Sequence, residues 1–382
     1  MEDPKPKDKP SVEDTMAVSD ALGDGTDASI GERGLVVKDE DASFFSDLWK
    51  RWSTIRDRPS QSERLIAGTF CVLLMLLVWY LLTMGDPEKR VISPFLLPSL
   101  GEMLGSVKSL WFERALMRST LWSVGRVLGG FMLAAAFAVP LGVMAACFPR
   151  VNAFLRPLSV FGRNIPIAAL IPLTLIWFGL GESQKVMFIF LSSVAFIFFD
   201  TTHAVDGVSS RFLDTAYTLG AKPVPKQGVI RSLVIGSIYG ALMVLALILF
   251  QRIEVPSMPW VDVLKKPGIW IGGAVGLVCG FLVWWPIQSH QAIRKVLLPL
   301  ALPNIVNSLR LLYGLAFGYI MLAEVINAKL GLGNIIIMSQ RRGPREHIYL
   351  ILILIALLAF AIDRFVLWQQ KRWFPYKEDG DA

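Results

Sequence analysis

The sequence has little charge and few of the residues that most often bind metals or carry out catalysis. Charged side chains make up 18% of its 382 residues, against roughly 25% in soluble globular domains. Its three cysteines and three histidines are scattered, with no Cys-x-x-Cys pair and no Cys/His cluster. A disulfide framework and a metal site are therefore not expected, and no clustered catalytic groups suggest an enzyme.

Two further absences concern phosphate ligands. No G-x-x-x-x-G-K-[ST] motif occurs, so any ATP must be handled by another chain. No basic run is long enough to follow a nucleic-acid backbone. The net charge is +7, with 15 acidic and 10 basic side chains in residues 1–64, so the remainder carries +12. Such an excess is typical of Lys and Arg that hold membrane-protein loops in the cytoplasm.

Long apolar runs are abundant, and 54% of the residues are hydrophobic. Repeated runs of roughly 20 residues indicate a polytopic membrane protein. Because a membrane span must satisfy its own backbone polar groups, the predicted fold is all-α. About eight spans are expected, with both termini cytoplasmic. They cover residues 65–84, 121–147, 164–183, 186–199, 233–250, 269–287, 305–326 and 348–368.

The pattern along the chain predicts seven segments. The tail is polar and rich in Asp, Gly and Pro, and aromatic residues then recur at helical spacing. The segments are a disordered cytoplasmic tail (1–42), a juxtamembrane amphipathic helix (43–63), the first span with an outer segment (64–120), the first part of a core (121–226), an inserted two-span segment (227–290), the second part of the core (291–376) and a cytoplasmic tail (377–382).

Three features inside or beside the spans have both structural and functional interpretations. Pro166 and Pro172 interrupt the third span. This span is either a kinked helix with a packing role or a broken segment that lines a translocation path. Arg126 either snorkels to the interface or pairs within the bundle. Glu324 lies beside Gly331 and Gly333. It is either a hydrogen-bond partner for a helix end or part of a gate.

A polar stretch at residues 209–222 separates two very apolar regions. It predicts a short helix with Leu213, Ala216 and Tyr217 on one face, where they suit insertion into a groove on a partner protein. Arg211 and Asp214 would orient that helix by charge. Gly220 stands where the helix is expected to stop. The alternative is a solvated loop helix without a partner.

Four stretches together resemble a known family. They are 119–146, with Ser-x-x-Arg-x-x-x-Gly-Phe in its centre; 156–186, with paired prolines and Trp-Phe-Gly-x-Gly; 214–220, Asp-Thr-Ala followed by Gly220; and 323–336, Ala-Glu followed by Gly-Leu-Gly. Asp363–Arg364 also fits. Over about residues 95–226 and 288–376, the chain resembles the permease subunits of binding-protein-dependent ABC importers, and those for sulfonates, taurine, nitrate and related small anions most of all.

The family's coupling motif is split in this chain. The resemblance places Glu-Ala-Ala, three residues, Gly, nine residues, then Ile-x-Leu-Pro, and here the last part is Val296–Pro299. Residues 221–295 lie between Gly220 and this end, which is 75 where the family has nine. About 66 residues therefore split the motif. The sequence leaves open whether the helix is completed around Ile230 and resumed later, or whether the insertion displaces it.

The resemblance implies a type I importer core with two additional spans. Such a permease binds no cofactor and no nucleic acid. Its implied partners are cytoplasmic ABC ATPase subunits, an extracytoplasmic solute-binding protein and a second permease subunit in a homodimer, and its implied location is a bacterial inner membrane. The resemblance places ATPase coupling at Arg211, Leu213, Asp214, Ala216, Tyr217, Gly220 and Pro299, and the path or gate at Pro166, Pro172, Glu324, Gly331 and Gly333. Competing hypotheses are a degenerate permease that acts as a scaffold, and an ion-coupled secondary transporter.

Overall fold

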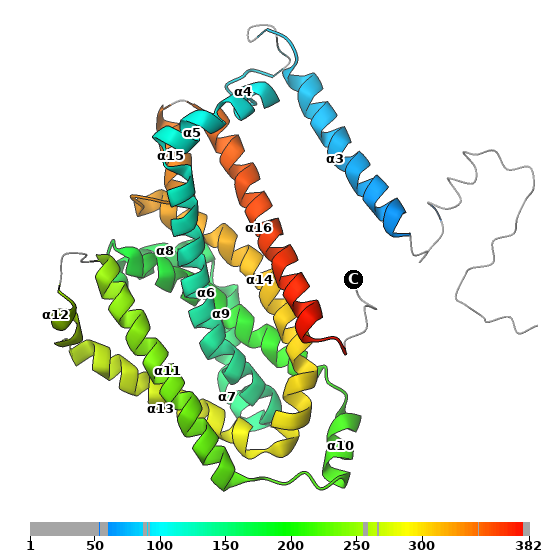
Figure 1. Ribbon diagram of the computed structural model, residues 1–382, viewed down its shortest axis with the longest axis vertical. Helices are drawn as coiled ribbons and strands as arrows, with labels where there is room; N and C mark the ends of the chain where they lie inside the picture. Colours follow the sequence, from blue (N-terminus) through cyan, green and yellow to red (C-terminus); the bar gives the residue numbers. More distant parts are fainter. Residues whose placement is uncertain are drawn as a thin grey trace, which may run out of the picture. The chain divides into compact units, whose positions relative to one another are not determined.

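The structure is a computed structural model that describes residue 53 and residues 60–86, 90, 92–254, 259–265, 267–342 and 344–376. Within these ranges every regular element is a helix (Figure 1). Contacts divide the chain into two units, Met1–Val78 and Trp79–Ala382, which are taken separately. The expected tails 1–42 and 377–382 and nearly all of the expected amphipathic helix 43–63 lie outside the described residues.

The helices follow one another with short connections. In chain order they are α3 (Gln61–Thr83), α4 (Leu100–Gly105), α5 (Val107–Glu113), α6 (Leu116–Cys147), α7 (Pro149–Asn164), η1 (Ile167–Ala169), α8 (Leu170–Phe178), α9 (Glu182–Asp206), α10 (Ser210–Thr218), α11 (Pro225–Glu254), α12 (Trp260–Lys265), α13 (Pro267–Ser289), η2 (Ile293–Leu297), α14 (Leu298–Asn327), α15 (Leu332–Arg342) and α16 (Glu346–Trp373).

Seven of these helices are long and apolar enough to cross a membrane: α3, α6, α9, α11, α13, the α14 segment and α16. An eighth crossing is counted if the bent pair of α7 with η1–α8 makes one span. α3 has 23 residues, so its length of about 34 Å exceeds the roughly 30 Å of a bilayer core. The described part of the chain is thus an all-α polytopic membrane protein, as the sequence predicts.

α6 and α9 form the centre of the larger unit and run in the same direction. A Cβ atom added to Gly130 of α6 would lie 2.6 Å from Cβ of Ile189. One added to Gly142 would lie 2.7 Å from Cβ of Thr201. Twelve residues along α6 therefore correspond to twelve along α9. Only glycine lets the two backbones approach this closely, which is the usual role of small residues in packed membrane helices.

α14 packs against both helices and runs in the opposite direction. Phe131 of α6 meets Tyr313 edge to face at 5.4 Å, while Arg126, earlier on α6, meets Glu324, later on α14. These directions define two ends of the core. The Glu182 end holds Leu116, Glu182 and Asn327, and the Cys147 end holds Cys147, Asp206 and Leu298.

The return from the Cys147 end to the Glu182 end is made by the bent pair. Because α6 and α9 are parallel, residues 148–181 must carry the chain back between them. α7 and η1–α8 meet at an angle of 91°, so the break lies at the start of the expected third span, residues 164–183. The break lies at Ile165, whose ψ is 127°, because the following Pro166 disfavours helical backbone before it.

Pro172 does not break the helix. It is the third residue of α8, a first-turn position whose N–H has no partner within the helix, so its absence costs little. The predicted interruption is therefore located at Pro166 alone. Both prolines are exposed in this chain.

The inserted segment is an antiparallel pair, α11 with α13, joined through α12. Glycines line its seam: a Cβ on Gly236 would lie 2.8 Å from the carbonyl oxygen of Leu277, and one on Gly240 would lie 2.9 Å from that of Gly273. The hydroxyl of Tyr239 donates to the carbonyl of Ala136 on α6 at 2.8 Å. The pair therefore packs tightly within itself and is tied to the core through α6.

Candidate functional site

A buried ionic cluster lies at the Glu182 end of the core. Arg126 is 4% exposed, and its guanidinium bridges two carboxylates. Nε and Nη2 donate to Glu182, the first residue of α9, with the Nη2–Oε1 distance at 2.9 Å. Nη1 donates to Glu324 of α14 at 2.6 Å and to the carbonyl of Leu330 at 2.7 Å. Arg126 therefore pairs within the bundle and connects α6, α9, α14 and the segment before α15.

Glu324 is completely buried, at 0% exposure. Both of its oxygens lie 2.8 Å from the Ser123 hydroxyl. Its Oε2 also accepts the backbone N–H of Gly333 at 3.0 Å, and the Ser123 Oγ accepts the N–H of Leu332 at 2.9 Å. Ser123, Arg126 and Gly333 thus all donate to this carboxylate, and such donors are needed to keep a buried charge in a low-dielectric setting.

The backbones of Gly331 and Gly333 pack directly against that carboxylate side chain. A Cβ on Gly331 would lie 2.5 Å from Cδ of Glu324, and one on Gly333 would lie 2.7 Å from Cβ of Glu324. Gly331 also has a φ of +138°, a backbone conformation that glycine alone adopts easily. The structure thus brings Glu324, Gly331 and Gly333 together as one contact unit.

The cluster contains equal numbers of positive and negative side chains. Lys185 of α9 is 2% exposed and lies 3.1 Å from Glu182, so two cations face two carboxylates. The sequence pointed to Glu324 and its two glycines and left two interpretations of Arg126, but it did not find Ser123, Glu182 or Lys185. Glu182 follows a glycine-rich turn and opens an apolar helix, which was the available signal.

Pro166 and Pro172 are not part of this cluster. They belong to the exposed broken segment, whose neighbours Ile176 and Trp177 are 80% and 59% exposed. The sequence had grouped these prolines with Glu324 as one set. In the structure they form a separate apolar surface, while Glu324 is sealed among protein donors.

The second candidate region is α10, set apart from the bundle at the Cys147 end (Figure 1). Gly220 ends it with a φ of +86°. The N–H of Gly220 donates to the carbonyl of Tyr217 at 3.0 Å, and that of Ala221 donates to Ala216 at 2.9 Å. These two bonds make a Schellman motif, which a left-handed glycine stabilises. The expected helix stop at Gly220 is observed.

The faces of α10 differ from the expectation in one respect. Ala216 is 8% exposed, and Leu213 packs against a buried cluster that includes Ile293 and Leu297 of η2. Both therefore face this chain rather than a partner. Tyr217 is 60% exposed, as expected for a docking residue. The spacing of Leu213 and Ala216 marks an apolar face without saying what covers it, so their role in ATPase coupling stays a prediction.

The exposed side of α10 combines apolar and charged residues. Phe212 and Leu219 are 51% and 82% exposed, and Arg211 and Asp214 are also exposed. Pro299 lies in the first turn of α14, where its carbonyl accepts the Tyr376 hydroxyl at 2.6 Å. Partial burial raises the pKa of Tyr376.

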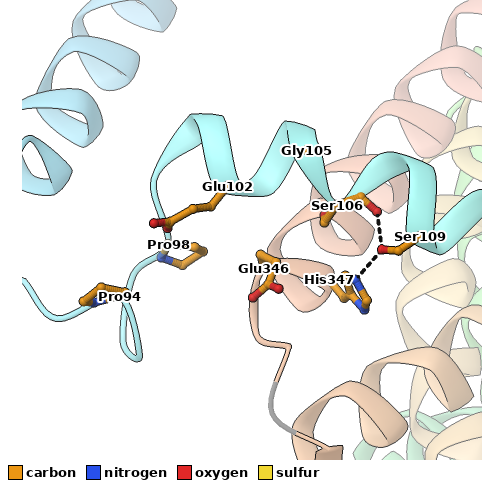
Figure 2. A pocket seen from close by; sticks show the side chains of 8 residues that line it. All are labelled: Pro94, Pro98, Glu102, Gly105, Ser106, Ser109, Glu346 and His347. Atoms are coloured by element: carbon orange, nitrogen blue, oxygen red, sulfur yellow. Dashed lines mark hydrogen bonds between the residues drawn. The ribbon is translucent and has the colours of Figure 1, made fainter. Parts of the chain in front are cut away.

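A polar pocket of about 420 Å³ lies beside the start of α16 (Figure 2). Glu102 of α4 and Glu346 of α16 line it, together with His347, whose Nε2 lies 2.9 Å from the Ser109 hydroxyl. Glu102 is held by Arg90 at 3.0 Å. Glu346 has no hydrogen bond or ion pair with any residue that the structure describes. No group of three or more His, Cys, Asp or Glu suited to a metal ion occurs in the described ranges.

These features describe an all-α polytopic membrane protein. Residues 138–255 and 287–375 match the family model described as "Binding-protein-dependent transport system inner membrane component". The chain belongs to this family of ABC transporter permeases. As a member it is the membrane component of an ABC importer and not an enzyme, and the ATP is hydrolysed by a partner subunit.

Three relatives illustrate the similarity. A putative ABC transporter permease protein of Methanocaldococcus jannaschii is 24% identical over 306 residues, which cover 80% of this chain and 90% of the relative. The taurine transport system permease protein TauC of Escherichia coli is 24% identical over 83% of this chain and 91% of its own length. The putative aliphatic sulfonates transport permease protein SsuC of Bacillus subtilis is 22% identical, with 76% and 82% covered.

Proposed function

We propose that this permease carries a small anion such as taurine, another sulfonate or nitrate into a bacterial cell, driven by a cytoplasmic ATPase that binds α10. The observation that supports coupling most directly is the geometry of α10. It is a short helix outside the bundle, stopped by Gly220, with Phe212, Tyr217 and Leu219 exposed. Exposed apolar side chains on an amphipathic helix suit insertion into a groove on another protein.

The orientation follows from this assignment. The Cys147 end is cytoplasmic and the Glu182 end is extracytoplasmic, which leaves both chain termini in the cytoplasm. Arg341, Arg342 and Arg345 then lie outside, against the usual bias of basic residues. Arg345 has a local structural role, because its guanidinium stacks 3.4 Å from the Phe95 ring and donates to the Phe95 carbonyl at 3.0 Å.

The broken segment supplies the proposed path. Its exposed residues, including Pro166, Pro172 and Ile176, form an apolar surface that a second permease subunit would cover, with the path between the two copies. The ionic cluster around Arg126 and Glu324 is proposed to hold the extracytoplasmic ends of α6, α9 and α14 together. Opening of a gate at this end would have to separate buried charges, which is energetically costly. We therefore assign the cluster to keeping this end closed and not to binding the solute.

Two partners and the substrate complete the proposal. An extracytoplasmic solute-binding protein would dock at the Glu182 end, where Glu346 in the pocket is available to a basic side chain. The names of the relatives support the substrate class, since taurine and aliphatic sulfonates are both small sulfonates. Loss of the permease should abolish growth on taurine as sole sulfur source while growth on sulfate continues. Equal growth of both strains on taurine and alkanesulfonates would refute the substrate class.

The coupling proposal is tested by purifying the tagged chain in mild detergent and measuring the ATPase retained. Wild type should retain a stoichiometric ATPase, and Gly220→Arg should lose it while the chain stays in the membrane. Gly220→Asn is the matched control, because Asn tolerates a positive φ and should preserve binding. A folded wild-type chain without any ATPase would favour the scaffold hypothesis.

A further inference from the structure

The two halves of the split coupling motif meet again in space. Pro223, three residues after Gly220, pairs with His290 as an isolated antiparallel bridge. The N–H of Val224 donates to the carbonyl of Ser289 at 2.7 Å. Immediately beyond, a Cβ on Gly228 would lie 2.7 Å from Cα of Ser289. The chain therefore leaves the coupling region at Pro223 and returns to the same point at His290.

The length of the closed segment agrees with the interruption seen in the sequence. Residues 224–289 number 66. Residues 221–223 and 290–295, which remain outside the bridge, number nine. Nine is the spacing between Gly220 and the Ile-x-Leu-Pro end in the motif that the sequence resembles. The bridge thus closes the chain at the positions that restore this spacing.

The inner face of α10 rests on the part of the chain just beyond the junction. Leu213 packs on the cluster containing Ile293 and Leu297 of η2, and the ring of His290 lies 5.6 Å from that of Phe148 at the end of α6. α10 therefore packs on the chain segment that follows the insertion. The family match continues along α11 before its gap at 256–286, but α14 is the helix that packs with α6, α9 and α16.

The two long helices of the enclosed hairpin, α11 and α13, pack closely against each other. Their seam is formed by close approaches at Gly236 and Gly240 on α11 and at Gly276 and Gly280 on α13, where an added Cβ would lie within 3.1 Å of an atom of the opposite helix. Such contacts need no third helix. A hydrogen bond from the Tyr239 hydroxyl to the Ala136 carbonyl joins the hairpin to the core.

Exposed charges near the junction come from both sides of it. Arg211, Lys222 and Lys226 precede the hairpin or begin it, and Lys295 follows on η2; all four are exposed, as are the acids Asp206 and Asp214. A surface with exposed apolar side chains and a basic border fits a partner with an apolar groove and an acidic border.

We propose that Val224–Ser289 is a self-closed membrane hairpin inserted into the coupling region, and that α10 and η2 form one continuous ATPase-docking surface across its base. This rests on the proposed function for the identity of the partner. The arrangement of the hairpin and its base can be tested without that partner, so the two can fail separately.

The first test uses the full-length chain with its native cysteines replaced by alanine. Paired residues of an antiparallel bridge have Cα atoms roughly 4.5–5.5 Å apart, within disulfide range. Pro223→Cys with His290→Cys should form an intramolecular disulfide on oxidation of isolated membranes, seen as a linked peptide pair that reduction releases. Pro223→Cys with Lys295→Cys is the control and should link far less. Equal disulfide formation in the two pairs, or no disulfide between positions 223 and 290, would show that the two ends of the hairpin are not paired.

The second test removes the hairpin. Deletion of residues 224–289 should leave a membrane-inserted chain that retains its ATPase at close to the wild-type level. Deletion of 227–289 leaves three additional residues, 224–226, so that twelve instead of nine separate Gly220 from the Ile-x-Leu-Pro end, and it should lose the ATPase. If the full chain retains the ATPase and an inserted 224–289 deletion does not, the proposed continuity is wrong. If the full chain never retains it, the proposed function fails instead.

Charge reversal provides an independent readout if the deletion does not accumulate. Lys295→Glu should reduce ATPase retention several-fold, as Arg211→Glu should, although the two residues are 84 positions apart in the sequence. Lys265→Glu, on the far side of the hairpin and 72% exposed, is the matched control and should have no effect. Loss with Arg211→Glu but not with Lys295→Glu would restrict docking to α10 and overturn the composite surface.

Discussion

The carboxyl carbon of Glu324 lies 2.5 Å from the place where Gly331 would carry a Cβ. The two residues are seven apart in the sequence, and Gly331 reverses the chain so that Gly333 can donate its N–H to the same carboxylate. This contact explains why an acid at the end of a membrane helix is followed by glycines at those two positions.

Gly331→Ala tests that contact. The added methyl group would collide with the Glu324 carboxylate, and alanine at a φ of +138° is strained, so we expect a loss of about 2 kcal/mol or more in unfolding free energy. Thermal unfolding in detergent measures it. Gly314→Ala on α14 is the control, since nothing lies within 4 Å of its added Cβ and alanine favours helix. Similar melting of both variants would contradict the packing.

Removing one charge of the buried cluster should be costly. Glu324→Gln leaves Arg126 buried with one carboxylate, and breaking a buried ion pair typically costs about 3–5 kcal/mol. Asp363→Asn breaks the Arg310–Asp363 pair at 3.3 Å, whose side chains are 16% and 37% exposed, and should cost roughly 1 kcal/mol or less. Chemical unfolding of both variants under identical detergent conditions compares them. A Glu324→Gln cost no larger than that of Asp363→Asn would show that Glu324 is not a structural clamp.

The sequence specified the helices better than the contacts between them. Apolar length predicted the spans. The sequence predicted interruptions at both Pro166 and Pro172, and the structure has its break before Pro166 alone. The partner of Arg126 was not predictable, because Glu182 lies 56 positions away and periodicity carries no information on which helices meet. The contact of Leu213 with its own chain was not predicted for the same reason, since the residues that Leu213 packs against lie in η2, beyond the hairpin.

The interruption of the coupling motif shows a different limit. Counting residues gave the size of the insertion but placed it at 227–290, because the outer ends of the apolar runs were the only visible borders. In the structure one backbone hydrogen bond joins Val224 to Ser289, and we propose this point as the junction. Backbone pairing of this kind has no side-chain signature, so it could not be found from composition or periodicity.

The cap of α4 should depend on pH. The N–H of Ser99 donates to the Glu102 carboxylate at 2.9 Å, and this bond, assisted by Arg90, holds the pKa of Glu102 below its ordinary value of 4.5. A carboxyl with a lowered folded-state pKa contributes stability above its ordinary pKa, and this stability is lost as the pH falls through the lowered value. Amide exchange in residues 100–105, corrected for intrinsic rates, should therefore accelerate below pH 4.5. Glu102→Gln should remove this extra pH dependence, and an identical profile in both proteins would refute the assignment.

Glu346 should contribute to docking of the solute-binding protein without contributing to folding. Its carboxylate lines the pocket beside α4 and has no hydrogen bond or ion pair with a described residue. Glu346→Gln should therefore leave the melting temperature within about 1 °C of the wild-type value, because surface changes away from such contacts shift the free energy of unfolding by less than about 0.5 kcal/mol. ATPase stimulation by the cognate binding protein should need several-fold more of that protein, with the maximal rate unchanged, since a lost charge pair at a surface weakens association. Glu113→Gln, on α5 outside the pocket, is the matched control. A lowered maximal rate at saturating binding protein, with no change in the concentration required, would assign Glu346 to the transport cycle instead of to docking.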